Sequence, residues 1–332
     1  MALDLSNKRI IMIHGLASKP PEADWFELWK RCVIENIRVD DRELAQRMTD
    51  AQEELFASAY WANATPHHLE DTRAYVNKLR EQVDKVIAER RRVRDRFHVG
   101  PGEAVGAFFK NRGIDVVKLL AGALTVKDDV MRAFLRETEL YDQDQYIADR
   151  MREPLENALR AAWDGGREVV ILSHSMGTFI AYDVLWRFAH RTVPGFKRYN
   201  RRKVALFVTM GSPLGDPTVR DLLFARHFES NSKRRFPTNI ERWHNYAALG
   251  DVVSHISNFD DSFFTPMREL GLFPARRRYR AINYEKLHNP FETVPTPANR
   301  DREKRNPHKS YGYLVQPRLG TWLADFLYGR LR

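Results

Sequence analysis

The stretch Glu168–Phe188, with the sequence EVVILSHSMGTFIAYDVLWRF, decides the fold class of this chain. Its first part, EVVILS, is a short apolar run typical of a strand that is buried on both faces of a sheet. Its second part, from Met176 to about His190, is a longer apolar run typical of a buried helix. Because a strand that passes directly into a helix is the building unit of α/β proteins, we expect a parallel sheet flanked by helices.

The same alternation of strand and helix continues on both sides of this stretch. The other expected strands cover residues 8–13, 55–61, 203–210, 242–249 and, more weakly, 277–282. One helix follows Pro21, and another runs from about residue 144 to 163 before a pair of glycines. A terminal helix is indicated by apolar residues at helical spacing: Leu319, Trp322, Leu323, Phe326 and Leu327.

The region between the second and third expected strands divides the chain. Residues 1–65 hold the amino-terminal part of the core, and residues 146–332 hold the remainder. Residues 66–145 between them are predicted to form a helical insertion, a candidate cap or lid. Its apolar residues, concentrated between Gly106 and Leu124, favour either contact with an acyl chain or bilayer, or packing on the core as an extra helical layer.

Composition restricts the class of protein. With 332 residues, 43% hydrophobic and 30% charged, the chain is an ordinary globular one. The single cysteine, Cys32, excludes an internal disulfide and any metal site built from several cysteines. No His-Glu-x-x-His pattern, glycine-rich phosphate loop or dinucleotide fingerprint occurs, so we expect no metal and no cofactor.

The amino terminus lacks the pattern of a secretory signal. Asp4 precedes its only short apolar run, and no small-residue cleavage site follows that run. The later apolar stretches are interrupted by charges and are too short to span a membrane. We therefore expect a cytoplasmic protein.

The net charge of the chain is +10, and the excess of basic residues lies after residue 150. Three clusters contain much of it: Lys197, Arg198, Arg201, Arg202 and Lys203; Lys233, Arg234 and Arg235; and Arg276, Arg277, Arg278 and Arg280. Such clusters attract phosphates and anionic lipid head groups, which favours peripheral contact with an anionic membrane; a solvated basic surface is the alternative. No nucleic-acid-binding signature accompanies the charge, so we expect no nucleic acid partner.

The turn Ser173-His174-Ser175-Met176-Gly177 between strand and helix carries the strongest chemical signal. A turn this sharp strains its central residue, so the residues two before and two after it must be small, as Ser173 and Gly177 are. The hydroxyl of Ser175 is then presented at the carboxyl end of the sheet and the start of a helix, where free N–H groups favour a developing anion. Ser173 is a poor alternative nucleophile, because bulky Ile171 lies two residues before it.

With this turn in its strand and helix context, the chain resembles the α/β-hydrolase fold and, within it, the lipase and esterase-like serine hydrolases. The family pattern is Gly-x-Ser-x-Gly, and here Ser173 occupies the position of the first glycine. Residues 10–16, IIMIHGL, resemble the family's strand and the His-Gly that follows it.

The resemblance implies how an oxyanion would be bound. Its donors would be the backbone N–H of Met176 and that of Leu16 or Gly15. A glycine in this loop lets the backbone approach a reacting carbonyl closely. We interpret His14 as a structural brace of the loop rather than a proton carrier.

The family places an acid after the nucleophile and a histidine near the carboxy terminus. Asp251, which follows the strand at 242–249, is our first choice for the acid, and Asp216 in GSPLGD is the alternative. Asp260 and Asp261 lie further into a loop and fit less well.

For the base, His308 in NPHKSYGYL lies in a polar loop shortly before the terminal helix, which is the position that the family gives to its histidine. Among the other histidines, His288 lies further from that helix, His255 follows Asp251 too closely, and His244 lies inside a strand.

The resemblance therefore implies a serine hydrolase in which Ser175 attacks a carboxylic ester, His308 takes its proton and Asp251 orients His308. The apolar insertion and the basic clusters favour a lipid or acyl ester over a small polar one. Two alternatives stay open: a non-catalytic hydrolase-fold protein whose insertion binds a partner, and an acyltransferase or thioesterase that uses the same three residues.

Overall fold

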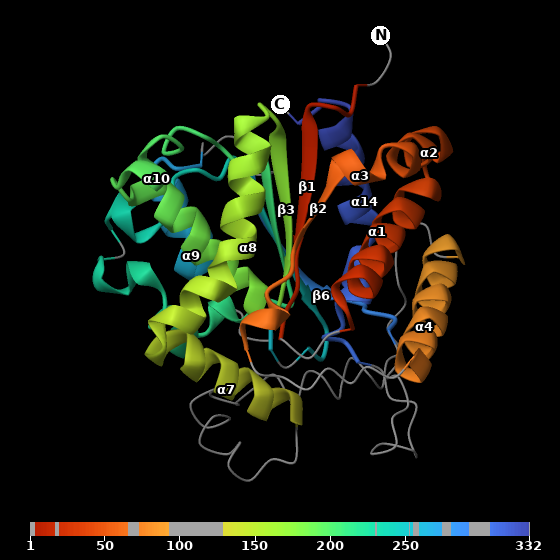
Figure 1. Ribbon diagram of the computed structural model, residues 1–332, viewed down its shortest axis with the longest axis horizontal. Helices are drawn as coiled ribbons and strands as arrows, with labels where there is room; N and C mark the ends of the chain where they lie inside the picture. Colours follow the sequence, from red (N-terminus) through yellow and green to blue (C-terminus); the bar gives the residue numbers. More distant parts are fainter. Residues whose placement is uncertain are drawn as a thin grey trace.

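A single parallel sheet forms the centre of the molecule (Figure 1). The computed structural model describes residues 4–16, 20–65, 73–92, 129–229, 231–251, 253–254, 259–273, 280–291 and 306–331. The six strands of its sheet are β1 (Lys8–Ile13), β2 (Phe56–Ala59), β3 (Glu168–His174), β4 (Leu206–Met210), β5 (Trp243–Ala248) and β6 (Ala281–Leu287). The predicted α/β class, with a parallel sheet flanked by helices, is confirmed.

Helices cover both faces of this sheet (Figure 1). One layer contains α1 (Glu22–Arg38) and α14 (Pro317–Leu327), with α4 (Arg73–Arg92) packed on α1. The other layer contains α8 (Gln145–Asp164) and α9 (Met176–His190), with α7 (Asp129–Gln143) packed on α8. The shorter α-helices are α2 (Arg42–Asp50), α3 (Gln52–Leu55), α10 (Pro194–Lys197), α11 (Pro217–Arg220), α12 (Thr265–Glu269) and α13 (Ser310–Leu314).

The six strands lie in the order β2-β1-β3-β4-β5-β6. The chain therefore moves to one side of β1 to form β2 and to the other side for all later strands. As a result α1, which follows β1, and α9, which follows β3, lie on opposite faces of the sheet. Open parallel sheets bind their ligands at the carboxyl ends of two strands related in this way. Gly15 follows β1 and Ser175 follows β3 at this point.

Local sequence signals set several element boundaries. Helix α8 begins where the Asp144 carboxylate accepts hydrogen bonds from the N–H groups of Tyr146 and Ile147, at 3.0 and 3.1 Å. It ends at Asp164, and Gly165 caps it. The following Gly166 has a φ of 69°, a conformation that favours glycine. Strand β1 and helix α9 have the bounds that the sequence predicts.

Two parts of the chain differ from expectation. Strand β6 begins at Ala281 rather than at residue 277, and residues 274–279 lie outside the described residues. Helices α2 and α3 fill a region for which the apolar pattern predicted no element. Helix α2 begins directly after Asp41, whose carboxylate accepts a hydrogen bond from the N–H of Leu44 at 2.9 Å and caps the helix.

Of the predicted insertion, residues 66–145, the structure describes α4 and α7 and the two residues after α7. The apolar segment 106–124, on which the prediction of a cap or lid depends, lies outside the described residues. Within the part of the chain that is described, no helix combines the length and the hydropathy needed to cross a membrane.

Candidate functional site

Ser175 occupies the turn between β3 and α9 in a conformation that residues other than glycine seldom adopt. Its φ is 53° and its ψ is −130°. The N–H of Ser175 donates to the carbonyl of Met210 at 2.9 Å, which ties the strained residue to the end of β4. The turn thus holds Ser175 at the carboxyl end of β3.

The neighbours of Ser175 are small for different reasons. A Cβ at Gly177 would lie 2.2 Å from the carbonyl oxygen of His14, so α9 approaches the end of β1 too closely for any side chain there. Ser173 is buried within the sheet, where its Oγ donates to the carbonyl of Val208 at 2.6 Å. Ser173 is therefore held by β4, and Ser175 is the serine of this turn that contacts His308.

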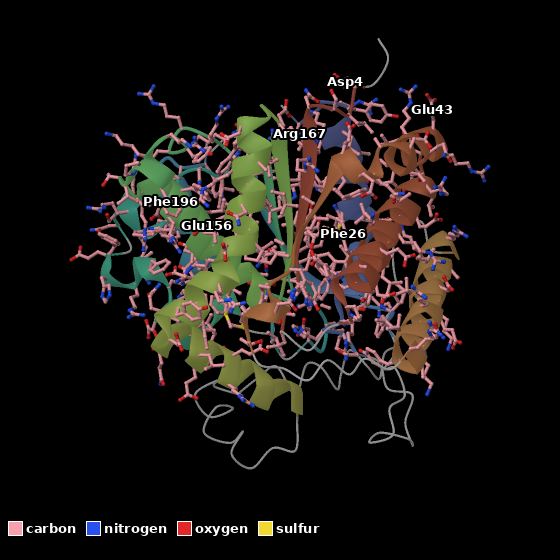
Figure 2. The ribbon with its side chains drawn as sticks, in the orientation of Figure 1. Asp4, Phe26, Glu43, Glu156, Arg167 and Phe196 are labelled. Atoms are coloured by element: carbon pink, nitrogen blue, oxygen red, sulfur yellow. The ribbon has the colours of Figure 1, made fainter. Side chains whose placement is uncertain are left out.

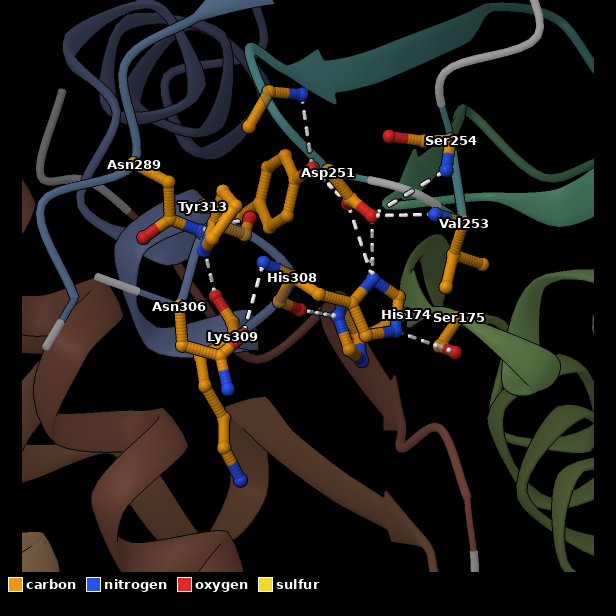
Figure 3. A network of polar contacts seen from close by, with 12 residues as sticks. His174, Ser175, Asp251, Val253, Ser254, Asn289, Asn306, His308, Lys309 and Tyr313 are labelled. Atoms are coloured by element: carbon orange, nitrogen blue, oxygen red, sulfur yellow. Dashed lines mark hydrogen bonds and ion pairs between the residues drawn. The ribbon is translucent and has the colours of Figure 1, made fainter. Parts of the chain in front are cut away.

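His308 connects Ser175 with Asp251 (Figure 3). Its Nε2 lies 2.9 Å from the Oγ of Ser175, and its Nδ1 lies 3.0 Å from each carboxylate oxygen of Asp251. The side chain of His308 is 16% exposed, whereas that of Asp251 is fully buried. The structure thus brings together the three side chains that the sequence indicated as nucleophile, base and acid.

The buried carboxylate of Asp251 is stabilised as an anion. Burial alone would raise its pKa, but the neighbouring His308 and hydrogen bonds from His308, Tyr313 and Val253 outweigh burial and lower the pKa below its ordinary value. The hydroxyl of Tyr313 donates to Oδ2 at 2.6 Å, and the N–H of Val253 donates to Oδ1 at 2.9 Å. An anionic Asp251 can hold a proton on Nδ1 of His308 and stabilise a positively charged imidazolium.

The other candidate acids belong to other segments of the chain than Asp251. Asp216 is buried after the turn Pro213–Gly215, and its carbonyl accepts a hydrogen bond from the N–H of Arg220 at 3.1 Å. Asp260 and Asp261 begin a helical turn at Asp260–Phe264. Asp251 is the carboxylate that contacts His308.

The other candidate histidines have different surroundings. His244 is buried within β5, with its ring centroid 4.6 Å from that of Trp322. The carbonyl of His288 accepts a hydrogen bond from the side chain of Gln316 at 2.9 Å. His255 lies outside the described residues.

Three consecutive carbonyl groups anchor the loop that carries His308 (Figure 3). The side-chain N–H groups of Asn289 donate to the carbonyls of Pro307 and Lys309 at 2.7 and 2.8 Å. Between them, the carbonyl oxygen of His308 lies 2.6 Å from Nε2 of His174. These contacts hold the His308 backbone on both sides of the imidazole, so they position the ring between Ser175 and Asp251.

Sequence reasoning missed His174, Asn289 and Gly211 as parts of this site. Gly211 follows β4 with a φ of 56°, and a Cβ there would lie 3.0 Å from Oδ2 of Asp251 and 3.1 Å from Nδ1 of His308. The segment GSPL predicts only a turn, because glycine and proline are common in turns. No local signal shows that Gly211 faces residues that lie much later in the chain.

The loop after β1 lies directly against the turn at Ser175. A Cβ at Gly15 would lie 2.7 Å from the Cβ of Ser175, so only glycine allows this approach. Leu16 follows Gly15 and is partly buried, and Met176 is the first residue of α9. The N–H groups of a first helical turn have no acceptor within the helix, so that of Met176 suits the role the resemblance implies.

His14 supports this loop. Its Nε2 accepts hydrogen bonds from the N–H groups of Trp61 and Ala62 at 3.0 and 3.2 Å, and its Nδ1 lies 2.8 Å from the carbonyl oxygen of Gly15. A ring nitrogen that accepts two hydrogen bonds carries no proton, so His14 is neutral. This arrangement agrees with the interpretation of His14 as a brace.

Within the described residues, no group of three or more His, Cys, Asp or Glu side chains is placed to hold a metal ion. A scan against protein-family models finds no match to this chain, and searches of curated proteins and of solved structures find no significant match.

Proposed function

We propose that this protein is a serine hydrolase that cleaves a carboxylic ester through an acyl-enzyme. The observation that carries the proposal is the continuous contact from Ser175 Oγ through His308 to the buried Asp251. A histidine within hydrogen-bond reach of a serine, and itself oriented by a carboxylate, is the arrangement that activates a serine hydroxyl. A purely structural serine would need neither the strained turn nor this partner.

Each group has a defined task in the proposed reaction. Ser175 Oγ bonds to the ester carbonyl carbon while Nε2 of His308 takes its proton, and Asp251 stabilises the resulting imidazolium. The tetrahedral intermediate then breaks its bond to the alcohol oxygen, which receives the proton from His308 and leaves. Water repeats the same steps on the acyl-serine and releases the carboxylic acid.

The backbone N–H groups of Met176 and Leu16 are the proposed donors to the oxyanion. Gly15 brings its loop against Ser175, and α9 starts at Met176, so both donors belong to segments that border the nucleophile. Preorganised donors of this kind stabilise the charge that develops in the transition state.

The arrangement of the sheet supports an α/β-hydrolase fold. Ser175 lies in a strand–turn–helix unit, at the point where the strand order reverses, and beside the glycine-containing loop that follows the neighbouring strand β1. This is the structural context in which the Gly-x-Ser-x-Gly pattern has chemical meaning. The preference for a lipid or acyl ester comes from the apolar sequence 106–124 of the insertion.

Labelling with a fluorophosphonate probe tests the proposal. We expect the wild-type protein to be labelled, and Ser175→Ala and His308→Ala to lose labelling. Ser173→Ala serves as the matched control and should keep it, because Ser173 is bonded to Val208 within the sheet. A folded wild-type protein that is not labelled would contradict the proposal and favour a non-catalytic binding protein.

The substrate class is tested next with p-nitrophenyl esters of increasing acyl length and with phospholipid vesicles. A rise in kcat/KM with acyl length supports a lipid or acyl ester, and a preference for acetate contradicts it. Added alcohols and thioesters separate the remaining alternative: transfer to an alcohol in preference to water indicates an acyltransferase, and fastest cleavage of a thioester indicates a thioesterase.

A further inference from the structure

A basic pocket of about 510 Å³ lies at the end of the sheet opposite to Ser175. Its walls include Val169, near the start of β3, and the exposed loop that precedes β4. From Val169 to Ser175 the chain follows β3, a length of about 20 Å for a strand of this size. Figure 2 shows Arg167, which lines the pocket, at this end of the sheet. The pocket is therefore separate from the candidate catalytic site.

Four basic side chains line the pocket: Arg167, Arg201, Arg202 and Lys203. They come from two segments, the turn between α8 and β3 and the loop before β4, which converge on one concavity. The two carboxylates of the walls already have basic neighbours. Glu168 lies 2.8 Å from Lys8, and Glu241 lies 4.0 Å from Arg242.

The four basic side chains of the pocket form no ion pair among the residues that the structure describes. Arg167 and Lys203 donate to the backbone carbonyls of Glu54 and Thr238, which orients them without removing charge. Burial and the neighbouring charge of Arg167 both lower the pKa of Arg9, as expected where cations gather.

Two other basic residues of the sequence clusters already have partners within the protein. Arg235 donates to the carbonyls of Ala225, Arg226 and Phe228, so its guanidinium caps a turn of the chain. Arg198 is paired with Asp164 at 3.2 Å. Arg201 and Arg202, in contrast, make no side-chain hydrogen bond or ion pair with any residue that the structure describes.

We propose that this pocket binds a phosphate-bearing anion. Its volume is in the range of small-molecule sites, which favours a compact ligand over a nucleic acid strand. Guanidinium groups match phosphate oxygens with two parallel hydrogen bonds, and several cations in one concavity suit a ligand with more than one negative charge. The ligand is either a free phosphorylated molecule or the head group of an anionic lipid.

The position of the pocket limits what a bound free ligand or a bound lipid head group can reach. Because it faces away from the carboxyl ends of the strands, a molecule bound there does not reach Ser175. A lipid head group held by Arg201 and Arg202 would anchor the protein with Ser175 directed away from the bilayer. The pocket is therefore an anchoring or regulatory site and not the substrate site of the proposed hydrolase.

Calorimetric titration of the full chain with inorganic pyrophosphate tests the proposal. We expect saturable binding to the wild type that weakens with added salt. In the double variant Arg201→Ser and Arg202→Ser, affinity should fall by about tenfold or more, because two charge-assisted contacts are lost. The control combines Arg150→Ser and Arg318→Ser, two exposed arginines outside the pocket, and should bind like the wild type.

A flotation assay with vesicles of phosphatidylcholine and phosphatidylserine in equal parts separates the two sources. Vesicle binding that depends on Arg201 and Arg202 assigns a lipid head group, and pyrophosphate binding without vesicle binding assigns a free ligand. The proposal is overturned if the wild type binds neither probe, or if the control variant loses as much affinity as the pocket variant. Fluorophosphonate labelling, measured on the same samples, reports on Ser175 separately.

Discussion

At the scale of single residues, the site depends on side chains that fix His308 from several directions. The carboxylate of Asp251 contacts Nδ1 of the ring, and the hydroxyl of Tyr313 donates a hydrogen bond to that carboxylate. The side chains of Asn289 and His174 contact backbone carbonyls on and next to His308. None of these partners is next to His308 in the sequence. The positions of Ser175 and His308 relative to each other are therefore set by a network and not by one contact.

Separate replacement of each candidate acid by asparagine is the first test at this scale. Asp251→Asn should lower kcat/KM by about four orders of magnitude, because the side chain no longer fixes the tautomer of His308 as a carboxylate does. Asp216→Asn should change kcat/KM little, because Asp251 is the carboxylate that contacts His308. Steady-state ester hydrolysis by both variants decides the assignment, and a larger loss in Asp216→Asn would reverse it.

Asn289 is predicted to position His308. Asn289→Ala removes the two hydrogen bonds to Pro307 and Lys309, so the imidazole should shift and kcat should fall by about 100-fold with little change in KM. The control Asn239→Ala removes a similar bond to the carbonyl of Leu185, away from the site, and should lower stability without lowering kcat. Equal kcat values in the two variants would show that Asn289 has only a structural role.

At the scale of elements, the turn at Ser175 requires α9 to lie very close to the end of β1. Gly177→Ala would place a methyl group 2.2 Å from the carbonyl oxygen of His14, so the helix must move away from the strand. We expect a loss of stability of about 3 kcal/mol in urea unfolding, together with loss of fluorophosphonate labelling.

Gly195→Ala is the matched control for this substitution. Nothing lies within 4 Å of a Cβ at Gly195, which belongs to the short helix α10. This substitution should raise stability by up to about 1 kcal/mol, because alanine restricts the unfolded chain more than glycine does. Similar unfolding midpoints for the two variants would show that the contact between α9 and β1 is not tight.

A second buried carboxylate joins α7 to α9. Asp183 accepts hydrogen bonds from the hydroxyl of Tyr141 and the N–H of Phe224, at 2.8 and 3.0 Å. Burial raises the pKa of Asp183 to about 6, although these bonds and the charges of Arg152 and Arg187 oppose the shift. The folded state thus binds this proton more tightly than the unfolded state, whose pKa is near 3.8. The stabilisation is complete below about pH 4 and is lost as pH rises to about 6.

Asp183→Asn should remove this dependence. Relative to the wild type, the variant is expected to become more stable between pH 4 and pH 7 by roughly 3 kcal/mol, since a shift of one pKa unit corresponds to about 1.4 kcal/mol. Urea unfolding at several pH values measures the difference, with Asp221→Asn as a control on an exposed carboxylate. A difference that stays constant with pH would contradict the raised pKa of Asp183.

At the scale of the whole molecule, the six strands form one continuous core with the candidate catalytic site at one end and the basic pocket at the other. The two ends share no lining residue, so substitutions at one end should leave the other unchanged. Cys32 on α1 is fully buried in the same core, and burial raises the pKa of its thiol.

Cys32 therefore provides a probe of global unfolding. In the native protein the thiol should be inert toward a disulfide reagent, because it is both inaccessible and protonated. In urea it should react at once, and since the chain has one cysteine the signal is unambiguous. Fast reaction of the native protein, with Cys32→Ser as the blank, would show that α1 opens without global unfolding.

The sequence by itself determined the parallel α/β class, strand β1, helix α9 and the strained turn between β3 and α9. These features depend on short-range patterns: apolar runs of strand or helix length and a small residue on either side of Ser175. It also indicated Asp251 and His308, through the resemblance to a family that places an acid after a later strand and a histidine near the carboxy terminus.

Only the tertiary structure decided which carboxylate contacts His308 and what holds that loop. Ser175 and His308 are 133 residues apart, and Asp251 and His308 are 57 residues apart. The contacts of Gly211, His174 and Asn289, and the convergence of Arg167 with Arg201 and Arg202, have the same origin. Loops far apart in the chain meet according to how the sheet and its helices pack. Local sequence patterns do not predict that packing.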